Sequence, residues 1–386
     1  MNDEATHHLL AEIGASELDL RQGVSMQDRE DAHDRWALSE IRPDLQGGSN
    51  TTNRAPRGEE KMIETRRTVI ASGLFGALAI VSGSIPVRAL SWPQRPVKFI
   101  VPFGPGAGAD IGARVLADKL QTKWEKPVVV ENRPGGDSMV AITTFLNAND
   151  DHTFLFAPAG NFTVHPFIYS QLPYDPKELI PIARVSNTIL AVAVKADSPF
   201  MTIKDFTEAA RVAPGKFNAA MVQGITEFTF WGYEHAEGLE IVQVPYRDIN
   251  ASAVDLGEGR IQIVMLSYAM MQAQAQAGRI RVLLVSNSMR APVLPDVPTA
   301  REAGYSSLEV EGLVGLFGIK SIPDDLKEKI AADVRAVAAD GVIAERLKAT
   351  GQVINVGGPK EFAEAIEAQR VKIAATVQAI DFKPKL

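Results

Sequence analysis

The stretch Lys98–Leu120, KFIVPFGPGAGADIGARVLADKL, predicts a buried strand, a loop with three glycines and a helix in direct succession. A short apolar run followed by glycines is typical of a strand that ends at a turn, and helical spacing of apolar residues begins after Gly108. A glycine-rich turn at a helix N-terminus offers backbone N–H groups without intrahelical partners, and the helix dipole adds partial positive charge there. This stretch therefore indicates a site for an anionic group.

The same glycines give only half of a dinucleotide-binding fingerprint. Gly106 and Gly108 match its first half, and Glu131 ends the next apparent strand. Ile111, however, stands where the fingerprint needs a small residue for close helix–strand packing, and Pro105 removes an N–H group from the turn. We do not predict a nucleotide site here, and a purely structural tight turn is the alternative to an anion site.

Composition limits the classes of function. The chain has 386 residues, of which 46% are hydrophobic and 23% are charged, which is enough for two domains with their own cores. Residues 90–386 hold 30 Lys+Arg against 33 Asp+Glu, and this near balance argues against binding of nucleic acid or of an anionic membrane surface. The absence of cysteine excludes disulfides, a thiolate nucleophile and a cysteine-linked lipid anchor.

The N-terminal region reads as two segments without an enzymatic or binding role. Residues 1–61 are polar and acidic without sustained periodicity, so we expect them to be disordered. Residues 62–89 have the features of a signal peptide: Arg66-Arg67, the apolar run Val69–Ile85, and small residues before a cleavage site after Ala89. The expected location is the periplasm, reached by the Sec or the Tat route.

Two alternatives concern this region. The apolar run could be an uncleaved anchor, but it is about 17 residues long and rich in glycine and serine, at the low end of what spans a bilayer. A signal that starts so far into a chain is unusual, and translation that begins at Met62 would explain it, with residues 1–61 not translated in vivo. N-terminal sequencing of the exported protein tests this hypothesis.

Beyond residue 92, short apolar runs alternate with amphipathic stretches, which predicts an α/β fold with largely parallel sheets. In such sheets ligands bind at the carboxyl ends of the strands, where the first glycine-containing loop is expected. The predicted strands are 97–102, 128–130, 153–156, 189–194, 217–220, 241–244, 263–265, 282–285 and 314–319. The predicted helices are 108–123, 138–147, 204–212, 227–237, 250–257, 269–277, 298–303, 323–338, 341–350 and 360–378.

Several motifs in a fixed order resemble one family. They are VPFGPGAGADIGARVLADKL, PVVVENRPGG (127–136), HPFIYSQLPYDPKELIPIARV (165–185), VPYRD (244–248), AGRIRVLLVSNSMR (277–290) and LPDVPTAREAGY (294–305). From Trp92 to about residue 381, the chain is similar to the Bug (TctC-like) family, the periplasmic solute-binding subunits of tripartite tricarboxylate transporters. Several ordered motifs are more specific than any single one.

The resemblance implies a periplasmic binding protein fold of two Rossmann-like lobes joined by two crossing segments. Residues 92–191 and 313–386 would form the first lobe, and residues 192–312 the second. The lobes would close over a small carboxylate, held largely by backbone N–H groups, hydroxyl side chains and water. The implied partners are this ligand and integral membrane subunits of a transporter; we expect a monomer without a cofactor or metal.

On the first lobe, the resemblance assigns two ligand-binding loops. The first is Phe103–Asp110, in which the expected contacts are Phe103, Gly106, Ala107, Gly108 and Ala109. Asp110 is expected to cap the following helix instead, because an acid beside a bound carboxylate would repel it. The second loop is 157–163, in which the expected contacts are Ala159, Asn161 and Thr163; for Asn161 a turn role is the alternative.

On the second lobe, the sequence departs from the family in the segment 219–235, AAMVQGITEFTFWGYEH. Thr226 keeps a hydroxyl group and is an expected ligand contact. Phe228 is a further candidate, and if aromatic residues line the pocket, the ligand would be an aromatic or larger carboxylate. Helix packing is the expected role of Phe230 and Trp231, which have the spacing of a buried face.

The last expected contact is Tyr246, whose alternative role is that of a buried, hydrogen-bonded tyrosine. Arg247 could pair with a ligand carboxylate, but Asp248 beside it makes a surface ion pair an equal alternative. Leu266 replaces an acid that is common in the family after the preceding strand.

Catalytic function is not predicted. The sequence has no nucleophile elbow, no metalloprotease helix motif, no phosphate-binding loop and no histidine spacing typical of a metal site. Delivery of the ligand to a sensor rather than to a transporter, and an α/β enzyme with catalytic groups from distant segments, are the remaining alternatives.

Overall fold

The computed structural model describes residues 92–221, 224–246 and 249–384. These residues belong to one compact unit, Ser84–Leu386. The predicted disordered segment, the predicted signal peptide and the pair Arg247-Asp248 lie outside the described residues. Within those residues, no helix combines the length and the apolar character needed to cross a membrane.

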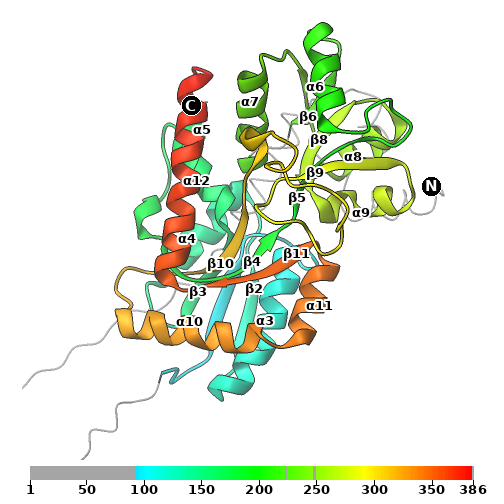
Figure 1. Ribbon diagram of the computed structural model, residues 1–386. Coiled ribbons are helices and arrows are strands. Elements are labelled where there is room, and N and C mark those ends of the chain that lie inside the picture. Colours follow the sequence, from blue (N-terminus) through cyan, green and yellow to red (C-terminus); the bar gives the residue numbers. More distant parts are fainter. Residues whose placement is uncertain (1–91, 222–223, 247–248, 385–386) are drawn as a thin grey trace, which may run out of the picture. The chain divides into compact units, whose positions relative to one another are not determined.

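The first sheet has six strands in the order β11-β4-β10-β3-β1-β2 (Figure 1). β1 pairs in parallel with β2 and β3, whereas β10 runs antiparallel to β3 and β4, and β11 runs antiparallel to β4. The strands are β1 Val97–Val101, β2 Val128–Asn132, β3 Thr153–Pro158, β4 Ile180–Thr188, β10 Gly312–Gly318 and β11 Gln352–Gly357.

The second sheet has five strands in the order β7-β6-β8-β5-β9. β6 is parallel to β7 and β8, and β5 is antiparallel to β8 and β9. The strands are β5 Leu190–Lys195, β6 Asn218–Met221, β7 Val242–Pro245, β8 Ile263–Ser267 and β9 Ile280–Val285.

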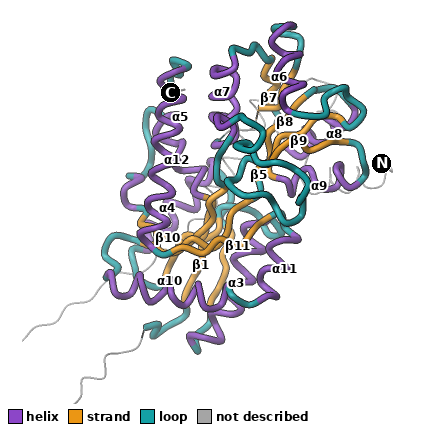
Figure 2. The backbone as a smooth tube through the Cα atoms, viewed as in Figure 1, coloured by secondary structure: helices purple, strands orange, loops and turns teal. Residues whose placement is uncertain are grey.

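Helices flank both sheets (Figure 2). They are α3 Gly108–Trp124, α4 Met139–Ala148, α5 Ala159–Ile168, α6 Ile203–Val212, α7 Ile225–Glu237, α8 Ile249–Glu258, α9 Tyr268–Gln276, α10 Asp324–Ala338, α11 Gly341–Ala349 and α12 Pro359–Ala379.

The central strands of the second sheet are apolar throughout because each of their faces is buried. Val192 of β5 and Met265 of β8 pack into one cluster with residues of α6 and α7. Ala193 and Leu266, the next residue on each strand, pack into a second cluster with residues of α8 and α9. Successive side chains on a strand point to opposite faces, so a strand covered on both sides needs an unbroken apolar run.

The chain passes between the two sheets twice. Ile189 alone separates β4 of the first sheet from β5 of the second, and residues 286–311 lead from β9 back to β10. Glu311, in the second crossing segment, links it to the end of β4 just before the first crossing: its carboxylate accepts hydrogen bonds from Asn187 Nδ2 of β4 at 2.5 Å, Asn287 Nδ2 at 3.1 Å and the Ser288 N–H at 2.9 Å.

The structure corrects three predictions from the sequence. The sheets are mixed rather than largely parallel, because β5 and β10 enter their sheets directly from the crossing segments rather than through a helical crossover. Strands β4 and β11 were missed, and so was α5, which begins within the predicted loop 157–163. The helix predicted at 298–303 is a series of turns.

Candidate functional site

Helices α3, α5, α7 and α9 each follow a strand and begin without a side-chain cap, and α4 and α10 also lack one. The N-cap residues of the first four are Ala107 for α3, Pro158 for α5, Gly224 for α7 and Ser267 for α9. By contrast, Thr202 caps α6 and Asp340 caps α11. Because no side chain accepts a hydrogen bond from the first-turn N–H groups of α3, α5, α7 and α9, these groups can donate to a ligand. The helix dipole favours an anion at this end.

Close contacts link these helix starts. The first turns of α5 and α7 touch, since Gly160 packs against Ile225. The start of α3 contacts β11, because Gln352 Nε2 donates to the Gly108 carbonyl oxygen at 2.8 Å. The neighbouring Gly351 packs against the first turn of α9. Because β1 adjoins β3 and β6 adjoins β8, the four helix starts lie around one region bordered by both sheets.

The loop Phe103–Asp110, here called the glycine loop, is held in place by Asp110. The buried Asp110 carboxylate accepts from the Gly106 N–H at 2.9 Å, from Arg114 Nε at 3.0 Å and from Asn132 Nδ2 at 2.8 Å. Burial opposes its ionisation, but these hydrogen bonds prevail and hold the pKa of Asp110 below its usual value. Asp110 therefore fastens the loop rather than capping α3 as expected.

The remaining residues of the glycine loop offer backbone groups. Gly106 has φ of 86° and is exposed, and Ala107 and Gly108 are half-buried. The Ala109 side chain is buried, and the Phe103 carbonyl oxygen accepts from Asn132 Nδ2 at 2.8 Å. The structure brings the expected contacts of this loop together at the start of α3; whether they touch a ligand stays a prediction.

The second predicted loop is largely helix α5, which places Thr163 inside the helix. The Thr163 side chain is 2% exposed, and its hydroxyl donates to Gln369 Oε1 of α12 at 3.0 Å. Thr163 faces α12, because position 163 lies more than one turn into α5. A ligand contact by Thr163 stays a prediction.

The other two residues of this segment lie in the first turn of α5. The Ala159 side chain is fully buried, so this residue can offer its backbone. Asn161 is half-buried, and its Nδ2 donates to Ser138 Oγ at 2.6 Å. This hydrogen bond to Ser138, in the turn before α4, fixes the orientation of the Asn161 side-chain amide and so of its acceptor Oδ1.

A left-handed turn before α4 contains Ser138, the hydrogen-bond partner of Asn161. The sequence predicted no role for this turn. Four successive residues, Gly135–Ser138, have positive φ, including the non-glycine residues Asp137 and Ser138. The Asp137 carboxylate lies 3.0 Å from Nε2 of the fully buried His165, whose Nδ1 lies 2.7 Å from the Tyr174 hydroxyl. A positive φ at a non-glycine residue costs about 1 to 3 kcal/mol, and this conformation is kept where surrounding contacts stabilise it.

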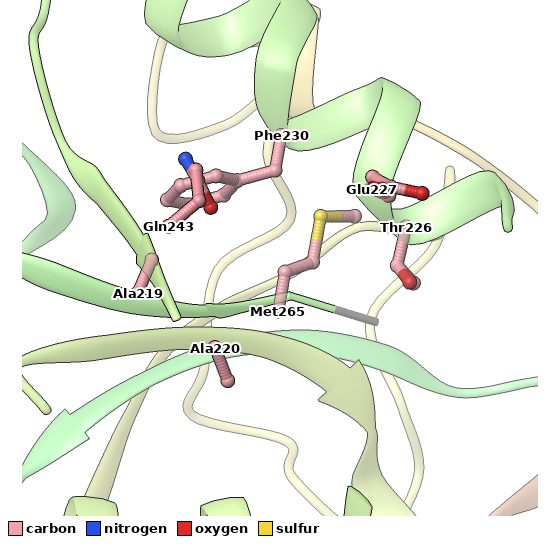
Figure 3. A pocket seen from close by; sticks show the side chains of 7 residues that line it. All are labelled: Ala219, Ala220, Thr226, Glu227, Phe230, Gln243 and Met265. Atoms are coloured by element: carbon pink, nitrogen blue, oxygen red, sulfur yellow. The ribbon is translucent and has the colours of Figure 1, made fainter. Parts of the chain in front are cut away.

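On the side of the second sheet, a small cavity lies between α7 and the strands (Figure 3). Figure 3 shows Thr226 and Glu227 on one side of Met265, and Phe230 and Gln243 on the other. The described residues that line this cavity, here called the α7 cavity, are Ala219, Ala220, Thr226, Glu227, Phe230, Gln243 and Met265.

Gln243 connects the α7 cavity to a buried acid. Its Nε2 lies 2.8 Å from both carboxylate oxygens of Glu234, whereas its Oε1 is buried without a hydrogen-bond partner among the described residues. Burial raises the pKa of Glu234 to about 7, against the opposing effect of hydrogen bonds from Gln243 and the Ile241 N–H.

The aromatic residues of α7 pack on two sides of the helix, and the packing expected for Phe230 and Trp231 is confirmed. Phe228, the candidate contact, is fully buried in a cluster of α5, α7 and α12, with its ring 5.2 Å from those of Trp231 and Phe382. Phe230 packs in the core of the second sheet as expected and also lines the α7 cavity. Residues two apart on a helix point in nearly opposite directions, so with residue 230 packed against the sheet, residue 228 points toward α5 and α12.

The half-buried Tyr246 has a hydrogen-bond partner within the protein, and a ligand contact by Tyr246 stays a prediction. Its hydroxyl donates to Asp255 Oδ2 at 2.7 Å, and burial together with this hydrogen bond raises the pKa of Tyr246 to about 12. Thr226 lies as expected in the first turn of α7, beside the α7 cavity. Within the described residues, no group of three or more His, Asp or Glu side chains could hold a metal ion.

Comparison with known proteins gives the family. The profile of the tripartite tricarboxylate transporter family receptor, TctC, matches residues 112–382. A UPF0065 protein of Pseudomonas sp. (strain P51) is 32% identical over 311 residues, which cover 79% of this chain and 91% of that protein.

Two solved structures resemble the fold. The periplasmic binding protein BugD is 25% identical, with a TM-score of 0.63 over 76% of this chain and 100% of its own. An R. palustris protein solved with adipate is 23% identical, with a TM-score of 0.66 over 76% and 100% of the two chains. The two-lobed α/β fold and the family expected from the ordered motifs are confirmed. The chain is a member of the TctC family, whose proteins are periplasmic solute-binding proteins and not enzymes.

Proposed function

We propose that this protein binds a small carboxylate where the first turns of α3, α5, α7 and α9 meet, and delivers it to integral membrane subunits of a tripartite tricarboxylate-type transporter. The observation that carries the proposal is the grouping of four helix starts without side-chain caps. Hydrogen bonds from backbone N–H groups to a desolvated carboxylate are charge-assisted and therefore strong.

The proposed capture is a closure of two lobes, residues 92–191 with 313–386 and residues 192–312. In the part of the chain that the structure describes, two segments join the sheets, and such a connection suits a hinge. Membership in the TctC family supports the transport role, and the adipate held by the R. palustris relative is a carboxylate of the proposed kind. Export to the periplasm would follow from the signal peptide predicted at residues 62–89.

A thermal-shift series tests the ligand class. The purified protein is heated with monocarboxylates, dicarboxylates and aromatic carboxylates, and with neutral and cationic solutes of similar size. A ligand that binds only the native state stabilises it by about 2.7 kcal/mol at a concentration of 100 Kd, so a true ligand raises the melting temperature. The proposal fails if a neutral or cationic solute raises it and no carboxylate does.

The transport role needs a separate measurement. Loss of the gene should abolish uptake of the radiolabelled carboxylate by intact cells, and the gene on a plasmid should restore it. Uptake that is equal with and without the gene would contradict delivery to a transporter while leaving the binding proposal in place.

A further inference from the structure

A groove lies between the two crossing segments and β11. It consists of two adjoining cavities that share Ile189 of the first crossing segment and Val353 and Ile354 of β11. Among the described residues that line it, none belongs to the first turns of α3, α5, α7 or α9, so it is separate from the proposed carboxylate site. This groove, here called the hinge groove, is defined by Asn187, Ile189, Asn287, Glu311, Val353 and Ile354.

The hinge groove contains a carboxylate without a cationic partner. The donors to Glu311 are two side-chain amides and one backbone N–H group, and all three are neutral. Within the part of the chain that the structure describes, Glu311 forms no ion pair with a lysine or an arginine. A carboxylate offers about four lone-pair sites, so Glu311 can accept from a further donor.

The other charged residues of the groove lining are already paired. Arg290 Nε lies 2.8 Å from Glu302 Oε2, and Lys348 Nζ lies 3.8 Å from Glu345 Oε2. Among the described lining residues, Glu311 is therefore the charge without a counter-charge, and it favours a cationic ligand.

A second acceptor lies next to this carboxylate. Asn187 is 5% exposed, and its Nδ2 donates to Glu311 at 2.5 Å, which fixes the orientation of its amide. The Asn187 Oδ1 atom is buried and has no hydrogen-bond partner among the described residues. Because Asn187 and Glu311 are hydrogen-bonded to each other, a ligand group with several N–H donors suits both acceptors.

The remaining surface of the hinge groove is largely apolar. Ile189 and Ala291 are buried, and Val353 and Ile354 are half-buried. Since Ile189, Val353 and Ile354 line both cavities, this apolar surface continues from one cavity into the other. A short aliphatic chain fits such a surface, and its removal from water would favour binding.

We propose that the hinge groove is a second ligand site, which binds a primary ammonium group on a short aliphatic chain. The ammonium group donates to Glu311 and to Asn187 Oδ1, and the chain lies along Val353 and Ile354. Charge-assisted hydrogen bonds are stronger than neutral ones, so an ammonium group is preferred over a hydroxyl group. This inference does not depend on the proposed carboxylate site.

Matched probes test the chemistry of the ligand. NMR titration of the isotope-labelled protein measures Kd for n-butylammonium, 1-butanol and n-butyltrimethylammonium. The first should bind about tenfold more tightly than either of the others, because 1-butanol lacks the charge and n-butyltrimethylammonium lacks the N–H donors.

Ser288→Phe tests the location of the site. Ser288 is an exposed residue of the groove lining, and it contacts Glu311 through its backbone N–H, which the substitution keeps. The larger side chain should obstruct the groove and weaken n-butylammonium binding at least about tenfold. The matched control is Ser306→Phe, at an exposed position of the same crossing segment outside the groove lining, which should bind as the wild-type protein does.

Glu311→Gln tests the role of the charge. It should remove the preference for n-butylammonium over 1-butanol, because the amide carries no charge. The control Glu208→Gln on α6, an exposed residue in an ion pair with Lys204, should keep the wild-type preference. The melting temperature of each ligand-free variant shows whether it is folded.

Two results would overturn the proposal. The first is equal affinity of the wild-type protein for n-butylammonium and 1-butanol. The second is wild-type affinity for n-butylammonium in a folded Ser288→Phe protein, since the cation would then bind elsewhere on the surface. Neither result concerns carboxylate binding, which the thermal-shift series tests by itself.

Discussion

Gly160, in the first turn of α5, lies directly against Ile225, the first residue of α7. A Cβ atom at position 160 would stand 2.9 Å from Ile225 Cγ2, closer than Cβ atoms approach other atoms in proteins. Helix α5 follows a strand of the first sheet and α7 follows a strand of the second. The missing side chain at position 160 therefore sets how closely two helix starts of the proposed site approach each other.

Gly160→Ala should weaken ligand binding. Alanine normally stabilises a helix relative to glycine by about 0.5 to 1 kcal/mol, but here the added methyl group overlaps a stiff β-branched side chain, and overpacking of this kind costs about 1 to 3 kcal/mol. We expect a lower melting temperature and about tenfold weaker carboxylate binding by calorimetry.

Gly341→Ala is the matched control for this change. Gly341 is the first residue of α11, and a Cβ atom there would meet no atom within 4 Å. The same substitution should leave affinity unchanged and stability equal or higher. Equal behaviour of the two variants would show that the contact between α5 and α7 does not control the site.

Gly108→Val tests the glycine loop. A Cβ atom at position 108 would lie 3.5 Å from Gln352 Nε2 and 3.6 Å from the Thr350 carbonyl oxygen, which is ordinary contact. Gly108→Ala should therefore fold and bind normally, whereas the branched valine should block close approach of a ligand to the backbone and reduce affinity at least about tenfold. Unchanged affinity in a folded Gly108→Val protein would reduce the loop to a structural turn.

The sequence predicted the elements whose signals are local. The apolar run before the glycine loop and the periodic stretch after it became β1 and α3 within one residue of the predicted boundaries. By contrast, β11 is an edge strand of half-buried residues with no apolar run, and β4 contains Pro181 and the polar pair Ser186-Asn187. Strand formation in such segments depends on their neighbours more than on their composition.

Local sequence signals were equally weak in parts of the candidate site. The segment AGNFTVHPFI carries Gly160, Asn161 and Pro166, which disfavour a helix, yet it forms α5 because it packs against α7 and α12. Thr163 bonds to Gln369, a residue 206 positions away, and no sequence pattern indicates such a partner. Whether Phe228 or Phe230 faces the sheet depends on how α7 packs against the second sheet and against α5 and α12, and the sequence of α7 does not fix this rotation.

Glu311→Gln should loosen the junction between β4 and the second crossing segment. The Glu311 carboxylate accepts three hydrogen bonds, and an amide at this position would turn one of its acceptors into a donor that faces Asn187, Asn287 or the Ser288 N–H. Hydrogen bonds to a charged group contribute about 1.5 to 3 kcal/mol, so we expect the free energy of unfolding in urea to fall by a comparable amount. Carboxylate affinity should change as well, because the two lobes would move about this same junction during the proposed closure.

Glu345→Gln on α11 is the control for the lost charge. Glu345 is 75% exposed and lies 3.8 Å from Lys348, so removal of its charge should leave both stability and affinity nearly unchanged. Wild-type stability in the Glu311→Gln variant would contradict a role for Glu311 in holding β4 and the second crossing segment together.

Glu234 should make stability depend on pH between about 4.5 and 7. Burial raises its pKa from an ordinary value of 4.5 to about 7, so in this interval the folded state holds a proton that the unfolded chain has released. The resulting stabilisation is fully present below pH 4.5 and is lost as pH rises through 7. Glu234→Gln cannot ionise, so above pH 7 it should exceed the wild-type free energy of unfolding by about 2 to 3 kcal/mol, with the difference shrinking toward pH 5. Urea unfolding of both proteins across this pH range measures the difference. If the free energies of unfolding of the two proteins changed with pH in parallel, the raised pKa of Glu234 would be contradicted.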